Sequence, residues 1–231
     1  KAQNIIHPKI AGPNGLWVNS YNGVLFFGQT DLETQNSAMP MQLRFYYNSS
    51  SYATNYGYGM GFSLGYEMRY TLDGEGNVTI TTGNGRSDTF KRYGTDYEPP
   101  AGVFSLLSCQ GNTYTLKEKD GTTYTFANAT HKKLTAITDR QGNTTELTYD
   151  AVNNLLTQIK DDVDHIITLT YTDSLLTEAS ASFHRGSIKY EYDAKKRLRK
   201  RTDAMGNSTL YAYTEEGRLE RITDANGHKT S

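Results

Sequence analysis

Apolar and polar residues alternate in short runs along most of the chain, which is the pattern of half-buried β-strands. In the second half the runs repeat: each is closed by a tyrosine, and successive tyrosines are 22, 21 and 21 residues apart, at Tyr149, Tyr171, Tyr192 and Tyr213. About 21 residues provide two tight turns and two strands of roughly 5 to 6 residues. The pattern therefore predicts an all-β fold, in which antiparallel β-hairpins stack into a curved, solenoid-like sheet.

A single hairpin of this length is not stable alone in water, because nothing covers its apolar face. Repeat proteins solve this by stacking each unit on its neighbours. We therefore expect the apolar face of each hairpin to be covered by the next hairpin.

The turns between the strands share the form Asp-x-x-Gly. An Asp at the first position can accept hydrogen bonds from backbone amides ahead of it, and Gly allows the positive φ that reverses the chain. The three turns run over residues 139–143, 203–207 and 224–228, with glycines at Gly142, Gly206 and Gly227.

A second series places Leu and Ile three residues apart, at Leu134 and Ile137, Leu156 and Ile159, and Leu219 and Ile222. In a regular strand this spacing puts the two side chains on opposite faces. Either a β-bulge returns both to one face, or both faces are covered. The pattern alone favours neither.

These motifs resemble the tyrosine-aspartate (YD) repeats of the RHS family. The resemblance is carried by Tyr149-Asp150, Tyr192-Asp193, the Gly217-Arg218-Leu219 that follows Tyr213, and the Asp-x-x-Gly turns. Blocks further upstream match the same family in order: residues 44–49, 57–62, 85–90, 97–102 and 120–126. Tyr171 and Tyr213 are followed by Thr instead of Asp, so their repeats are degenerate.

The resemblance implies the N-terminal part of a bacterial RHS protein, secreted or at the cell surface. Such proteins form a β-shell around a C-terminal effector, usually a toxin, in polymorphic or Tc-type toxin systems. The expected role is structural and non-catalytic, without a cofactor. The expected partners are that effector and other shell subunits. The alternative is a cell-surface adhesion or carbohydrate-binding module, whose exposed tyrosines would contact glycans.

Composition divides the chain into a lead-in over residues 1–13, a β-rich opening domain over 14–100 and hairpin repeats over 101–231. Within the opening domain the pattern predicts a hairpin around Tyr21-Asn22-Gly23 and strands on both sides of residues 73–77. The Gly-rich stretch 49–61 is predicted to be an ordered loop, with a flexible linker as the alternative. We read the chain as a fragment of a longer protein, whose open sheet edge would favour association.

The chain of 231 residues has a net charge of −1. It therefore has no overall field that would attract nucleic acid, and no apolar run approaches the length of a membrane span. The single cysteine, Cys109, excludes an intramolecular disulfide.

Catalytic motifs are weak. The histidines are scattered without the spacing of a zinc site, at positions 7, 131, 165, 184 and 228. Two acidic stretches, residues 161–164 and 73–77, contain an incomplete calcium-loop pattern, which polar turns explain equally well. We therefore predict no catalytic, metal or cofactor residue.

The strongest local charge is the basic run over residues 195–201. Regular alternation would place Lys196, Leu198 and Lys200 on one face and Arg197, Arg199 and Arg201 on the other. We expect these cations to pair with acidic residues of neighbouring repeats. Binding of nucleic acid or an acidic glycan is the alternative.

Overall fold

The computed structural model describes residues 9–11, 16–19, 24–35, 39–127 and 131–230. The predicted turn at Tyr21-Asn22-Gly23, most of the lead-in and His7 lie outside them. In this part of the chain all regular elements are antiparallel strands, apart from one 3-10 turn at Ser49–Ser51. The all-β prediction is confirmed.

The strands of the described residues form three sheets. The first contains β1 (Lys9–Ala11), β2 (Leu16–Asn19), β3 (Leu25–Glu33), β4 (Gln42–Asn48) and β5 (Phe62–Leu64). The second contains β6 (Arg69–Leu72), β7 (Val78–Thr81), β8 (Ser87–Tyr93) and β9 (Asp96–Glu98).

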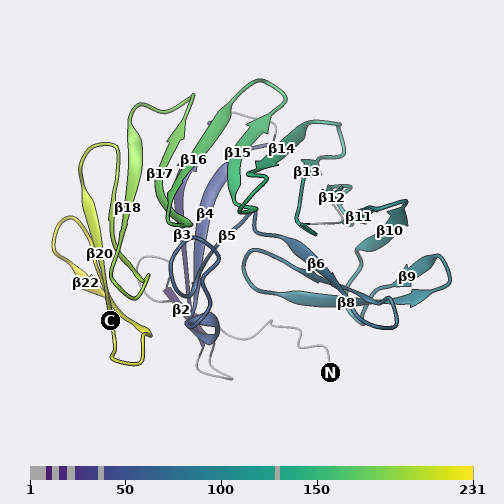
Figure 1. The fold of residues 1–231 in the computed structure, drawn as a ribbon, viewed down its shortest axis with the longest axis horizontal. Helices are drawn as coiled ribbons and strands as arrows, with labels where there is room; N and C mark the ends of the chain where they lie inside the picture. The colour runs from purple at the N-terminus through teal and green to yellow at the C-terminus, as the bar shows by residue number, and fades with distance from the viewer. Residues whose placement is uncertain (1–8, 12–15, 20–23, 36–38, 128–130, 231) are drawn as a thin grey trace.

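The third sheet holds 13 strands within the described residues, each paired with the next in chain order. They are β10 (Leu106–Gln110), β11 (Thr113–Lys117), β12 (Thr123–Phe126), β13 (Ala136–Thr138), β14 (Thr144–Tyr149), β15 (Leu156–Asp161), β16 (Ile166–Thr172), β17 (Leu175–Ala181), β18 (Ser187–Tyr192), β19 (Leu198–Thr202), β20 (Ser208–Tyr213), β21 (Leu219–Thr223) and β22 (Lys229–Thr230). This repeat sheet arches from β10 over β15 to β22 (Figure 1). The predicted curved sheet of hairpins is confirmed.

A β-bulge recurs in the repeat sheet. It lies where a strand that ends in a repeat tyrosine pairs with the strand that follows it; these tyrosines are Tyr149, Tyr171, Tyr192 and Tyr213. Tyr149 lies opposite Leu156, whereas the preceding Thr148 lies opposite Gln158, so Thr157 is the extra residue. The extra residues of the next three bulges are Thr177, Arg199 and Glu220.

The bulge settles the alternative that the Leu-x-x-Ile spacing left open for two of the three pairs, whereas strand pairing at Ile137 is regular. Leu156 and Ile159 are 1% and 0% exposed, so both face the core on the same side of the sheet. Leu219 and Ile222 are buried in the same way. The pair Leu176 and Ala179 belongs to the same series, although the sequence pattern did not reveal it.

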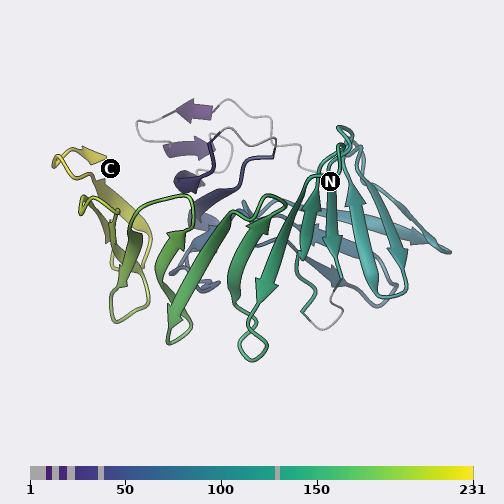
Figure 2. The same ribbon diagram turned by 90° about the horizontal axis from the view of Figure 1, so that it is seen from above.

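The apolar face of the repeats is covered by residues 24–35 and 39–70, which we call the N-terminal segment, and not by the next hairpin alone, so the stacking prediction is wrong in this respect. Strands β3 to β5 lie inside the arch, which Figure 2 shows as a curved wall in front of the N-terminal strands. Phe45 packs on Tyr190 with ring centroids 5.4 Å apart, and Phe62 packs on Tyr211 at 5.8 Å. One hydrophobic core therefore joins both halves of the chain.

The Gly-rich stretch is an ordered loop against the repeats, as predicted. Gly59 has a φ of +97°, and a Cβ there would lie 3.0 Å from the Tyr192 ring and 3.1 Å from the Leu198 amide nitrogen. Only a residue without a side chain allows this approach. The flexible-linker alternative is therefore wrong for this stretch.

Candidate functional site: the inner face of the repeat sheet

The tyrosines that define the repeat lie half-buried on the inner face, which we define as the side that faces strands β3 to β5. Each tyrosine hydroxyl donates to the backbone carbonyl of the leucine one repeat earlier. The contacts are Tyr149 to Leu134 (2.7 Å), Tyr171 to Leu156 (2.9 Å), Tyr192 to Leu176 (2.7 Å) and Tyr213 to Leu198 (2.7 Å). We call this series the tyrosine ladder.

The ladder includes Tyr171 and Tyr213, whose repeats looked degenerate in sequence. The contact depends on the tyrosine and on a backbone carbonyl, so the residue after the tyrosine can vary. Burial raises the pKa of all four hydroxyls, which therefore stay protonated and can donate.

The predicted Asp turns are confirmed. Asp139 Oδ1 accepts from the amides of Gln141 and Asn143, and its Oδ2 accepts from the Asn143 side chain at 2.6 Å. Asp203 and Asp224 repeat the arrangement. The turn glycines all have positive φ, at Gly142, Gly206, Gly217 and Gly227.

The same turn occurs where the sequence pattern did not show it. Asp161 accepts from the amides of Val163 and His165, with Asp164 at positive φ in the glycine position. Asp193 does the same with Lys195 and Arg197, whereas Asp150 accepts from the amides of Val152 and Asn153 in a turn that is one residue longer. The acidic stretch 161–164 is therefore a polar turn.

Two of the histidines lie in Asp turns, where each contacts the carboxylate of the turn aspartate. His165 Nδ1 lies 2.8 Å from Asp161 Oδ2, and His228 Nδ1 lies 3.0 Å from Asp224 Oδ2. Both occupy the position that Asn143 fills in its own turn. Within the described ranges, no three His, Cys, Asp or Glu side chains gather in a way that could hold a metal ion.

The N-terminal segment hydrogen-bonds to leucine amides of the repeats, at the bulges of Leu176 and Leu219 and also at Leu134. The Leu134 amide donates to the Met68 carbonyl at 2.9 Å, the Leu176 amide to the Gly57 carbonyl at 2.8 Å, and the Leu219 amide to the Tyr47 hydroxyl at 2.8 Å. Three repeats are therefore attached to this segment through one type of backbone group.

A buried polar network lies between β3 and the repeats. Arg201 Nε forms an ion pair with Asp31 Oδ1 at 2.7 Å, without the alignment of a hydrogen bond. Tyr190 donates to Asp31 Oδ2 at 2.5 Å, and Tyr211 donates to Gln29 at 2.9 Å. Burial raises the pKa of the Asp31 carboxyl. The positive charge of Arg201 and the hydrogen bond from Tyr190 act in the opposite direction and offset part of that rise.

This network corrects the interpretation of the basic run. Because Arg199 is the bulge residue, Leu198 and Arg201 share the inner face, and Arg201 takes the place that Ile159 has in its own repeat. Arg199 and Lys200 both pair with Glu191. Within the described residues, these pairs use Glu191 of the same hairpin and Asp31 of the N-terminal segment, not a neighbouring repeat.

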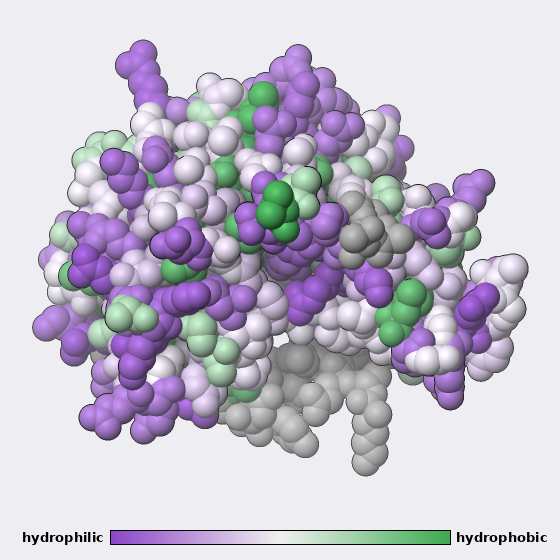
Figure 3. All heavy atoms as spheres, viewed as in Figure 1, coloured by the Kyte–Doolittle hydropathy of each residue, from purple (hydrophilic) through white to green (hydrophobic). Residues whose placement is uncertain are grey.

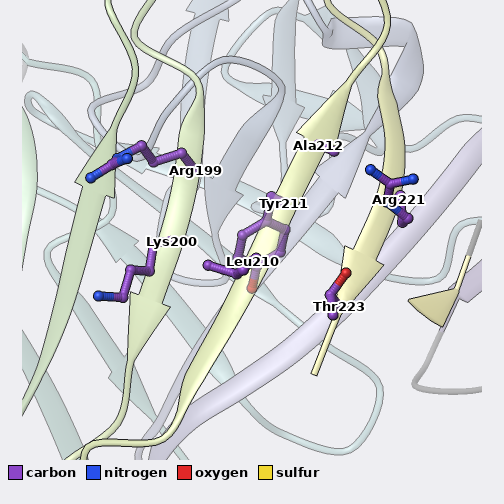
Figure 4. A pocket seen from close by; sticks show the side chains of 7 residues that line it. All are labelled: Arg199, Lys200, Leu210, Tyr211, Ala212, Arg221 and Thr223. Carbon is purple, nitrogen blue, oxygen red and sulfur yellow. The ribbon is translucent and has the colours of Figure 1, made fainter. Parts of the chain in front are cut away.

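The outer face has a shallow depression of about 300 Å³ over β19 to β21. Figure 4 shows Arg199, Lys200 and Arg221 around Leu210, which is 48% exposed. The surface in Figure 3 is mainly hydrophilic, with scattered apolar residues. Among the described residues, no helix has the length and apolar character needed to cross a membrane.

The bulged hairpins, the tyrosine ladder and the Asp turns define a β-hairpin repeat protein. A family model described as RHS Repeat matches residues 128–164 and 192–229. The chain is an RHS/YD-repeat protein. The unmatched stretch between the two matches contains Tyr171, whose ladder contact is nevertheless present.

A second model, described as a domain of unknown function (DUF6531), matches residues 15–90. No curated protein sequence matches the chain. Among solved structures, TcdB2-TccC3-Cdc42 is 13% identical with a TM-score of 0.36, and TcdB2-TccC3-TEV is 16% identical with a TM-score of 0.33. Each comparison covers 90% of this chain, but this chain spans only 12% and 11% of those chains.

We expect Tyr192→Phe to destabilise the fold by about 1–3 kcal/mol, because the Leu176 carbonyl loses its donor inside the core. Tyr93→Phe is the matched control, since Tyr93 is 61% exposed, and should change stability by less than about 0.5 kcal/mol. Urea unfolding followed by circular dichroism measures both. Equal stability of the two variants would contradict the role of the ladder.

The Asp turns predict a loss of stability in acid. Hydrogen bonds, chiefly from the Asn143 side chain, lower the pKa of the Asp139 carboxyl below its ordinary 3.8. A carboxyl with a lowered folded-state pKa stabilises the fold above 3.8, and this stabilisation is lost as the pH falls through the folded-state value. Asp139→Asn should therefore be less stable than the natural protein at neutral pH, and the difference should shrink below pH 3.8. A constant difference across the titration would contradict the assignment.

Removing one partner of the buried ion pair should cost more than removing both. Asp31→Leu and Arg201→Leu each leave a buried charge, which costs about 3–5 kcal/mol, whereas the double variant should recover most of that loss. The exposed pair Glu191 and Arg199 is the control, with an expected coupling below about 1 kcal/mol. Additive losses at Asp31 and Arg201 in urea unfolding would exclude a coupled pair.

Proposed function

We propose that the chain is a structural module of a β-shell, which encloses or presents a C-terminal effector of the same protein. The observation that carries this proposal is the arched sheet of bulged hairpins joined by the tyrosine ladder. RHS-repeat membership supports it. The role involves no catalytic chemistry.

The geometry supports a wall function because every repeat hairpin pairs with the next through backbone hydrogen bonds. Bulges bend and twist the strands in which they occur, and here they recur in four successive tyrosine hairpins. A sheet built in this way curves in one direction as repeats are added. Curvature of one sign is what a wall around an interior requires.

The inner face of these repeats is already filled by the N-terminal segment, with Phe45 and Phe62 packed on repeat tyrosines. We therefore place the enclosed effector beyond these repeats and not against them. A secreted or cell-surface location and an effector of toxin type are parts of the same proposal.

The adhesion hypothesis receives less support from the arrangement of the tyrosines. The four ladder rings are half-buried with their hydroxyls engaged, while Tyr190 and Tyr211 are buried. These six rings do not present a flat aromatic surface to a glycan.

The shell proposal predicts protection of the effector in the whole gene product. Limited proteolysis of the native protein should leave a C-terminal segment intact and bound to the repeat sheet, as measured by size exclusion and mass spectrometry. The same segment should be digested after mild denaturation, which is the control. Equal digestion rates before and after denaturation would contradict enclosure.

A further inference from the structure

A polar cavity of about 230 Å³ lies where the first and second sheets meet. Its walls come from the end of β4, the Gly-rich loop, the start of β6 and the turn between β7 and β8. The Ser63 hydroxyl donates to the Gly83 carbonyl at 2.6 Å and thereby ties the first sheet to that turn. The cavity is smaller than the roughly 300–1,000 Å³ of sites for drug-sized ligands, so it suits one small ring.

Two charged side chains line the cavity, and they differ in whether their charge is neutralised by an ion-pair partner. Glu67 is buried, and its Oε1 pairs with Lys133 Nζ at 2.9 Å. Arg69 lies with its guanidinium carbon 4.8 Å from the centre of the Tyr56 ring, and its Nη2 donates to the Tyr56 hydroxyl at 3.3 Å. Within the described residues, no carboxylate lies within ion-pair distance of Arg69. The cavity therefore contains a cation that an anionic group can neutralise.

The remaining wall consists largely of hydroxyl and amide groups. Asn84 Oδ1 accepts from the Thr82 hydroxyl and the Arg86 amide, and Asn48 Oδ1 accepts from the Ser50 amide and hydroxyl. Because both side-chain oxygens are used in this way, the two amide nitrogens are the groups available to donate to a ligand. Lone pairs of the wall hydroxyls can accept in return.

We propose that this cavity binds a small hydroxylated carboxylate, such as a sugar acid of one ring. The carboxylate pairs with Arg69, whose planar guanidinium suits two parallel hydrogen bonds. The ligand's hydroxyls exchange hydrogen bonds with the amide and hydroxyl groups of the wall. This site uses none of the ladder tyrosines and does not depend on the shell role.

Calorimetric titration with D-galacturonate and D-galactose tests the proposal, since the two sugars differ mainly in the carboxylate. The acid should bind at least about tenfold more tightly, which corresponds to the roughly 1.5–3 kcal/mol of a hydrogen bond to a charged group. Arg69→Gln should abolish this preference. Arg92→Gln is the matched control, because Arg92 is exposed on β8 away from the cavity.

A second variant tests the site independently, in case Arg69→Gln does not fold. Asn84→Asp keeps the oxygen that accepts the turn hydrogen bonds but replaces the donor amide with a negative charge at the cavity rim. It should weaken galacturonate binding at least about tenfold, while the thermal unfolding midpoint stays unchanged. Absence of galacturonate binding, equal affinity for both sugars, or an equal loss in Arg92→Gln would overturn the proposal.

Discussion

The fold depends on one hydrogen bond, from a tyrosine hydroxyl to the backbone carbonyl of the leucine one repeat earlier. At Leu156, Leu176 and Leu198, that leucine stands at or beside the position where the strand register shifts. A buried carbonyl without a donor costs about 1–3 kcal/mol, so a bulge in the core needs a partner from elsewhere. The tyrosine provides it with the same side chain whose ring fills the space between repeats. Bulge, ring packing and hydrogen bond therefore form a single unit that can be repeated.

The tyrosines provide hydrogen-bond donors to leucine carbonyls, and the N-terminal segment provides hydrogen-bond acceptors for leucine amides. Met68, Gly57 and Tyr47 each accept from one leucine amide, and the aromatic residues beside them cover the ring of the facing repeat. This N-terminal segment thus completes repeats that end near residue 222. Contacts of such long sequence separation slow folding, because the chain must close large loops before they form. We infer that the arch reaches its final packing only when both halves are present.

Local chemistry was readable from the sequence, and long-range chemistry was not. The Asp turns and hairpins follow from residue type and spacing, since each is formed by residues close together in the sequence. The same reasoning failed at Asp161 and Asp193, where Asp164 and Lys196 take the glycine position with positive φ. It also failed at Arg201, which has the place of an isoleucine in its repeat. A charged residue there is expected to face solvent, and its inward orientation becomes clear only from the ion pair with Asp31. Cover of the repeats by the N-terminal segment was missed for the same reason, and so was the cavity beside Arg69.

The ion pair at Arg201 distinguishes one docking position of β3 on the repeat sheet from the others, which the apolar positions of the sheet cannot do. Ile159, Ala179 and Ile222 are apolar side chains at equivalent places along the sheet, so they alone would distinguish poorly between docking positions of β3 one repeat apart. Arg201 breaks this equivalence. If β3 docked one repeat away, Asp31 would be buried opposite Ala179 or Ile222 without a cation, and Arg201 would lose its anion. An uncompensated buried charge costs several kcal/mol, which exceeds the difference between two apolar contacts of similar size. The ion pair therefore contributes less to stability than to position: it selects the single alignment in which the N-terminal segment meets the repeats.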